Sequence, residues 1–210
     1  WPSATNAIDK GVVLPETGTY TIRLEGSGEA TGSVKLTAYT FSDVTGSITP
    51  TKEGAKQSVS ITIPGQRAHY SVTVGSGQQV SVKTSNANWT ASSYCVEWRK
   101  PDGTYLDGRC QSKTSGSYWQ QQTFPSPGTY TLRVDPQDVI TGSVDLTVWD
   151  STDKTGSTIT PTSEGESKTF PVEVPGQKNF IAFSGTKDQT ISLVPSEASS
   201  GGSFEVLRPS

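Results

Sequence analysis

The chain carries one sequence pattern almost twice, and the copies are out of phase with its ends. The segment GTYTLRVDPQDVITGSVDLTVWDSTDKTGS, from Gly128, repeats GTYTIRLEGSGEATGSVKLTAYTFSDVTGS, from Gly18, at an offset of 110 residues. After a one-residue insertion, TITPTSEGESKTFPVEVPGQ, from Thr158, repeats ITPTKEGAKQSVSITIPGQ, from Ile48, at an offset of 111. A period this long is typical of tandem small domains rather than of a solenoid.

The repeat divides the chain into one whole unit, residues 46–154, and two halves, residues 1–45 and 155–210. Half of a β-sandwich leaves its core face and strand edges uncovered, at a high cost in free energy. We therefore expect the halves to be covered by each other within the chain, by neighbouring chains in a head-to-tail fibre, or by further repeats of a longer array. The sequence favours closure within the chain, because one chain supplies both halves at a high effective concentration.

Short runs of alternating apolar and polar residues predict an all-β fold. They recur at matching places in the copies: 20–24 and 130–134, 34–38 and 144–148, 59–63 and 170–174. Each run is bounded by Gly, Pro, Asn or Asp, and none keeps the periodicity of a helix. We predict two tandem antiparallel β-sandwich domains, with the second discontinuous if the two halves close on each other.

The two cysteines, Cys95 and Cys110, both lie in the complete unit. Between them, Asp102-Gly103 predicts a two-residue type I′ hairpin turn. Folding about that turn pairs residues whose numbers sum to 205, as 95 and 110 do, so the two cysteines should form a cross-strand disulfide. A disulfide in a small Ser/Thr/Gly-rich domain indicates an oxidising setting, and we expect a secreted or cell-surface protein.

The order of these motifs resembles the bacterial pre-peptidase C-terminal domain and related sandwich repeats of secreted and surface proteins. The motifs that carry the resemblance are the VEWRKPDGT hairpin, FPSPGTYTLRV and TGSVDLTV. The likeness covers the complete unit from about Ser58 to Trp149, and both partial copies. It implies a jelly-roll-like β-sandwich that serves as an accessory in secreted hydrolases and in large surface proteins. It implies no catalysis by the module, no catalytic residue and no cofactor.

Two tryptophans are the candidate ligand contacts. Trp119 is predicted to face outward, because its neighbour Tyr118 aligns with Ile8 and should face inward. Trp89 lies in the loop SNANWTASS and has no counterpart in the other copy. Exposed aromatic rings bind sugars and anchor interfaces, so both are candidate contacts for a glycan or cell-surface polymer. The alternative is that they pack against loops or the neighbouring unit, as Trp98 should pack in the core.

Other motifs give no support to catalysis or metal binding. LPETG, at Leu14–Gly18, matches a sortase signal, but TYTIRLEGSG follows it, so we interpret it as a turn that leads into a strand. His69 is the single histidine and should face solvent or a neighbouring unit, which supports neither a zinc site nor a catalytic triad. No calcium-loop motif occurs, and no pair of carboxylates is marked out as a glycosidase pair.

We therefore predict a non-catalytic structural, scaffold or adhesive repeat of a secreted or cell-surface bacterial protein. One alternative is a carbohydrate- or substrate-binding accessory module of a secreted hydrolase. Another is a subunit of an extracellular fibre assembled by domain complementation. The expected partners are a glycan or cell-surface polymer and other copies through the half domains. A formal net charge of -3 without a basic stripe predicts no nucleic-acid binding, and no apolar run is long enough for membrane insertion.

Overall fold

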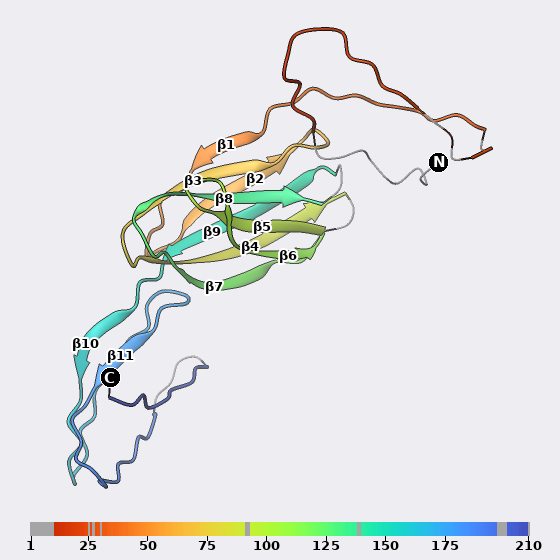
Figure 1. The fold of residues 1–210 in the computed structure, drawn as a ribbon. Coiled ribbons are helices and arrows are strands. Elements are labelled where there is room, and N and C mark those ends of the chain that lie inside the picture. The colour runs from red at the N-terminus through yellow and green to blue at the C-terminus, as the bar shows by residue number, and fades with distance from the viewer. Residues whose placement is uncertain are drawn as a thin grey trace.

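The computed structural model of the chain describes residues 11–24, 26, 28–29, 31–90, 93–137, 140–196 and 201–209. All regular secondary structure in these ranges is β-strand, which confirms the all-β prediction. Within the same ranges, no helix of a length and apolarity suited to crossing a membrane is found. A central sandwich lies between an N-terminal segment at one end and a C-terminal segment at the other (Figure 1).

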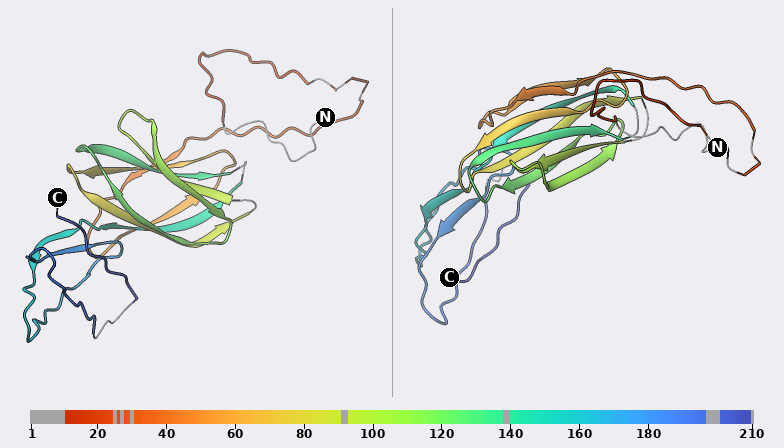
Figure 2. Two further views of the ribbon diagram at one scale, coloured as in Figure 1. Left: turned by 60° about the horizontal axis from the view of Figure 1, so that its bottom comes forward. Right: turned by 45° about the horizontal axis from the view of Figure 1, so that its top comes forward.

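The central sandwich consists of two sheets formed by β1 to β9 (Figure 1, Figure 2). The five-stranded sheet has the order β1 (Val44–Ser47), β3 (Ala68–Val74), β8 (Gly128–Pro136), β5 (Ser93–Arg99) and β6 (Tyr105–Ser112). The four-stranded sheet has the order β2 (Ala55–Ile61), β9 (Gly142–Asp150), β4 (Gln79–Trp89) and β7 (Ser117–Thr123). Neighbouring strands of the central sandwich are antiparallel except β1 and β3, which are parallel.

The core lies between the two sheets and follows the alternation in the sequence. Val72 and Leu132 of one sheet and Val59 and Leu146 of the other are buried, whereas the residues between them face outward. Because side chains alternate along a strand, the aliphatic residues at every second position all lie on one face of the sheet. The burial of their apolar area between the two sheets contributes most of the free energy that stabilises such a sandwich. Trp98 is fully buried in this core, as predicted.

The chain enters the central sandwich at one end and leaves it at the other. Val44 pairs with Ala68 at the start of β3, which we call the upstream end. Asp150 pairs with Val80 near the start of β4, which follows β3, and we call this the downstream end. β3 runs between the two ends over 7 residues, a length of about 20 Å at roughly 3.3 Å per residue.

The C-terminal segment repeats the beginning of the central sandwich. β10 (Lys154–Thr158) pairs in parallel with β11 (Asn179–Ala182), and Lys154 lies opposite Asn179. This pairing reproduces that of Val44 with Ala68, since 44 plus 110 is 154 and 68 plus 111 is 179. The register of β10 shifts between Lys154 and Ser157, which accommodates the inserted residue.

The strands expected at 20–24, 34–38 and 170–174 form no hydrogen-bonded ladder in the described part of the chain. Their counterparts in the central unit belong to β8, β9 and β2, and β8 pairs with β3 while β9 pairs with β2. In the partial copies, these partners belong to opposite halves. A strand needs a neighbour to satisfy its backbone groups, so the pattern alone does not produce one here.

Candidate functional site

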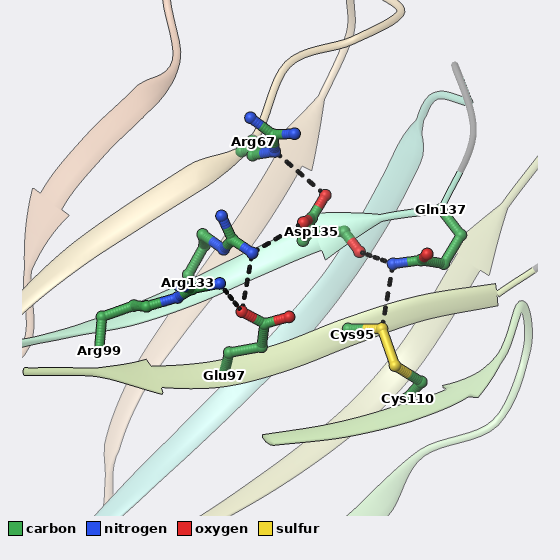
Figure 3. The surroundings of a disulfide bond; sticks show 8 residues. All are labelled: Arg67, Cys95, Glu97, Arg99, Cys110, Arg133, Asp135 and Gln137. Atoms are coloured by element: carbon green, nitrogen blue, oxygen red, sulfur yellow. Dashed lines mark hydrogen bonds and ion pairs between the residues drawn. A yellow bond between two sulfur atoms is a disulfide. The ribbon is translucent and has the colours of Figure 1, made fainter. Parts of the chain in front are cut away.

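The Cys95–Cys110 disulfide joins β5 and β6 where the two strands pair (Figure 3). Pairs from Ser93 to Trp98 keep the sum of 205, but the register shifts before Arg99, which pairs with Tyr105. The predicted type I′ turn is wrong. The Gly103 amide donates to the Lys100 carbonyl at 2.8 Å, and among the turn residues Gly103 alone has a positive φ, 81°. Pro101 fixes a negative φ and so favours a type I turn closed by a left-handed glycine.

A chain of charged side chains runs from Arg67, directly before β3, across β8 and β5 beside the disulfide (Figure 3). Asp135 lies 3.2 Å from Arg67 Nε and 3.0 Å from Arg133 Nη2. Glu97 accepts from Nη2 of both Arg133 and Arg99 at 2.7 Å. Each carboxylate therefore carries an arginine partner, and Asp135 is only 3% exposed. Such a network ties three strands together and leaves neither carboxylate as a free acid or base.

Both candidate tryptophans are buried, so the prediction that Trp119 faces outward is wrong. Trp119 is 5% exposed and lies 6.5 Å from Trp98, between ring centroids, while its neighbour Tyr118 is exposed. The register of β4 and β7 shifts between Val80 and Val82, which places Trp119 opposite the buried Val82. Trp89 is the last residue of β4 rather than part of a loop, is 3% exposed, and packs on Tyr94. Neither ring is placed to meet a ligand at the surface.

A shallow groove of about 410 Å³ lies on the outer face of β2, β9 and β4. Trp149 lines it together with the polar side chains of Lys56, Lys83 and Asp145. Asp145 accepts hydrogen bonds from the Ser58 hydroxyl at 2.6 Å and from the Asn86 amide at 2.8 Å. These hydrogen bonds hold the pKa of Asp145 below its ordinary value and keep the carboxylate charged. The sequence had not marked this groove, because its residues come from three strands.

The junction between the central sandwich and the C-terminal segment is centred on Asp153. Asp153 Oδ1 accepts hydrogen bonds from the Lys178 amide at 2.8 Å and from Gln121 Nε2 at 2.7 Å. Gln79 donates to Asp153 Oδ2 at 2.9 Å and accepts from the Asp153 amide at 2.7 Å. Gln177 donates to the Thr152 carbonyl at 2.9 Å. One carboxylate thus joins β4 and β7 of the sandwich to the start of β11.

Part of this network recurs at the upstream end, among residues of the central unit itself. The Arg67 amide donates to Asp43 Oδ1 at 2.9 Å, and Gln66 donates to the Ser42 carbonyl at 2.8 Å. The Val44 amide donates to the Arg67 carbonyl at 2.8 Å, as the Lys154 amide does to the Lys178 carbonyl at 2.8 Å. These partners correspond to those around Asp153 at offsets of 110 and 111. These contacts within a unit are therefore part of the repeat, and the PGQ motif supplies their glutamine. The contacts that come from the preceding sandwich, those of Gln79 and Gln121, occur at the downstream end.

A turn at Pro175-Gly176 packs against the downstream end of the sandwich. The Ser81 hydroxyl donates to the Pro175 carbonyl at 2.7 Å, and Val174 is buried. A Cβ at Gly176 would collide with the Tyr118 hydroxyl and lie 3.1 Å from the Ser81 Cβ. Tyr118 is 37% exposed, and its partial burial against this turn raises the pKa of its hydroxyl, with a smaller opposing effect of the hydrogen bond with Ser81. The Tyr118 ring also meets that of Trp149 at 6.4 Å.

The remaining motifs have local roles. The Glu16 carbonyl of the LPETG motif accepts a hydrogen bond from the Tyr20 hydroxyl at 2.7 Å. In the same way, the Ser126 carbonyl, before β8, accepts one from the Tyr130 hydroxyl at 3.2 Å. His69 Nε2 lies 3.1 Å from Asp43 Oδ2 at the upstream junction. Within the described ranges, no three His, Cys, Asp or Glu side chains form a group suited to a metal ion. The polar network at the downstream junction connects the central sandwich with the C-terminal segment.

The sequence matches no known protein family and no curated protein. Among solved structures, the chain is similar to the pre-peptidase C-terminal domain of a collagenase from Bacillus anthracis. That domain is 15% identical with a TM-score of 0.39, and the match covers 52% of this chain and 99% of the domain. The type of domain that the sequence resembles is thus among the similar structures.

Two further structures are similar over about the same share of the chain. PliG of Aeromonas hydrophila, a periplasmic lysozyme inhibitor, is 15% identical with a TM-score of 0.36, and the match covers 51% of this chain and 99% of PliG. A cycloisomaltooligosaccharide glucanotransferase of Paenibacillus sp. is 16% identical with a TM-score of 0.29. That match covers 47% of this chain and 16% of the enzyme.

Proposed function

We propose that this chain is a non-catalytic structural repeat of a secreted or cell-surface protein, in which sandwich units stack end to end through fixed junctions. The observation that carries the proposal is the hydrogen-bond network of Asp153, which joins Gln79 and Gln121 of the central sandwich to the start of β11. The contact of this carboxylate with its own unit recurs at Asp43, so each unit carries the same aspartate at its start. Charge-assisted hydrogen bonds from that aspartate to the preceding unit restrict the angle between the two units.

Two further features support an extracellular structural role. The Cys95–Cys110 disulfide links the two strands of a hairpin, and disulfides are typical of proteins in oxidising compartments. The buried Asp135 and the half-buried Glu97 are held in ion pairs with arginines, so these carboxylates stabilise the sheet and are not free for acid–base chemistry. An end-to-end array with stiff joints acts as a spacer or stalk.

The test measures the stiffness of the downstream junction. Spin labels are attached through Lys83→Cys in β4 and Ala182→Cys in β11, two exposed positions. The labelled chain is diluted with unlabelled chain, so that only distances within one molecule are recorded. A narrow distance distribution is expected, and Asp153→Ala should broaden it. Asp145→Ala removes a carboxylate with two hydrogen bonds away from the junction and should leave it narrow. A distribution that is already broad in the unmodified background would refute the stacked unit.

A second candidate function, binding of a glycan or cell-surface polymer, is favoured by the groove beside Trp149. An aromatic ring next to lysines and a charged Asp145 offers both a stacking surface and hydrogen-bond partners for a sugar. Trp149→Ala should abolish binding in a polysaccharide pull-down. Tyr105→Ala, which removes an exposed ring from β6 of the other sheet, should not. Equal binding of the two variants would exclude the groove.

A further inference from the structure

We propose that two segments of the N-terminal half of this chain pair with two segments of the C-terminal half of a second copy, in the register that joins β8 and β9 to β3 and β2 in the central unit. Residues 18–24 and 32–40 of one copy are the donor segments. Residues 166–172 and 179–185 of another copy, which include β11, are the acceptor segments. This inference deepens the proposed function, on which it rests, because it assumes that the partial copies form the same sandwich as the central unit.

The first observation is an uncovered apolar face on both halves. In the donor segments, Ile22 is 67% exposed and Leu36 is 50% exposed, whereas their counterparts Leu132 and Leu146 are at most 1% exposed. In the acceptor segments, Val172 is 61% exposed, against 1% for its counterpart Ile61. Alternating apolar residues with such exposure mark sheet faces made to be covered. Other exposed apolar residues of the donor segments are Tyr20, Leu24 and Val34.

The second observation is that the register of the central unit assigns each donor residue an apolar partner. Leu132 pairs with Tyr70, so at offsets of 110 and 111 Ile22 should lie opposite Ile181. Val144 pairs with Val59, so Val34 should lie opposite Phe170. Both predicted pairs are apolar, as cross-strand pairs facing a core must be.

The third observation is that each half already has the local structure of its place in the sandwich. The Tyr20 hydroxyl bonds to the Glu16 carbonyl as the hydroxyl of Tyr130 does to Ser126 before β8. β10 and β11 reproduce the pairing of β1 with β3. Ordering these parts before association lowers the entropy that association costs.

The fourth observation argues against closure within one chain. Thr40, the counterpart of Asp150, is four residues from Val44 at the upstream end, and four Cα steps reach about 14 Å. The acceptor is held at the downstream end by Asp153, roughly 20 Å away along β3. β10 and β11 lead away from the sandwich (Figure 1, Figure 2). A high effective concentration requires a linker that spans the sites, which this one does not.

Contacts of this kind between copies join unlike surfaces and do not close on themselves, so they propagate as a filament. The filament would alternate central units with units assembled from two chains. Asp43 and Asp153 would lie at alternate joints, and these joints would differ, because Gln79 and Gln121, which bind Asp153, have Thr190 and Gly11 as their counterparts.

The experiment measures the mass in solution over a range of micromolar concentrations. The chain should give multiples of 22.3 kDa that grow with concentration. Ile22→Asp in the donor should abolish this growth. Thr21→Asp is the matched control, because its counterpart Thr131 lies between buried residues and faces outward, and it should preserve association. Tryptophan fluorescence, which reports Trp98 and its neighbours in the central unit, should be the same for all three.

Mixing identifies the interface. Ile22→Asp has an intact acceptor, and Val172→Asp has an intact donor. Each variant alone should remain a monomer, and the mixture should stop at a dimer. A single mass of 22.3 kDa for the unmodified chain at every concentration would overturn the proposal. If the spin-label distance distribution is narrow at the same time, the proposal of stacked structural units still stands. The two experiments therefore refute the two proposals independently.

Discussion

Gly176→Ala should release the Pro175-Gly176 turn from the downstream end of the sandwich. Gly176 has φ of 88°, where an L-residue costs about 1–2 kcal/mol. Its new methyl group would also collide with the Tyr118 hydroxyl, and moving it away breaks the hydrogen bond from Ser81 to Pro175, worth about 1 kcal/mol. The sum of about 2–3 kcal/mol lowers the docked fraction roughly 30- to 150-fold, since 1.4 kcal/mol is a factor of ten.

Hydrogen exchange measures this directly, because the amides of Asp153 and Lys178 are bonded across the junction. Their protection should fall by that factor, while the amides of β3 and β8 keep theirs. Gly165→Ala is the matched control: φ is 78°, but nothing lies within 4 Å of the added Cβ. It carries the same backbone strain and should leave the junction amides unchanged. Unchanged protection in Gly176→Ala, or an equal loss in Gly165→Ala, would refute the argument.

Three further predictions concern the central unit. Replacing Cys95 and Cys110 by serine removes a cross-link over 15 residues and should lower the free energy of unfolding by about 3 kcal/mol, measured in urea, with the fold retained. Trp119→Ala should cost about 3–5 kcal/mol in the same assay, because the ring is buried, whereas an outward ring would cost under about 0.5 kcal/mol. The pKa of the Asp145 carboxyl should lie below 3.8, the ordinary value for an aspartate. The contribution of its hydrogen bonds to stability is therefore complete above pH 3.8 and is lost as the pH falls through the lowered pKa. Ser58→Ala, which removes the main cause, should move the NMR titration midpoint back towards 3.8.

Much of the central unit could be predicted from its alternating pattern. Runs such as 130–134 and 144–148 became β8 and β9, since period-two burial is a local property of a strand. The pairing of Cys95 with Cys110 also followed from sequence, because a hairpin register depends on a nearby turn. The turn type was missed because Pro101 shifts the turn by one residue.

Trp119 could not be placed because its orientation depends on another strand. SYWQQQT has no alternating pattern, and the register shift between β4 and β7 decides which face the ring takes. The junction was missed for a related reason. Asp153, Gln79 and Gln121 are distant in sequence and look like ordinary polar surface residues until β4 and β7 bring them together. One signal was present, since Asp43 and Asp153, and Gln66 and Gln177, are identical in the two copies.

The expectation of closure within the chain rests on the high effective concentration at which one chain supplies both halves. Effective concentration depends on whether a connector spans two sites, and that required the positions of the upstream and downstream ends. Val44 opposite Ala68 and Asp150 opposite Val80 supply those positions. They argue against closure within the chain and support the proposed pairing between two copies.

The most direct test of completion between copies is a disulfide across the predicted interface. Thr131 pairs with Ser71 on the outer face of the central unit, so Thr21 of one copy should lie opposite Ala182 of another at offsets of 110 and 111. A chain with Thr21→Cys and Ala182→Cys, oxidised and separated under non-reducing denaturing conditions, should give a ladder of covalently linked chains. Each single variant should give no ladder. A double variant that forms the new disulfide entirely within monomers would contradict the account and establish closure within the chain.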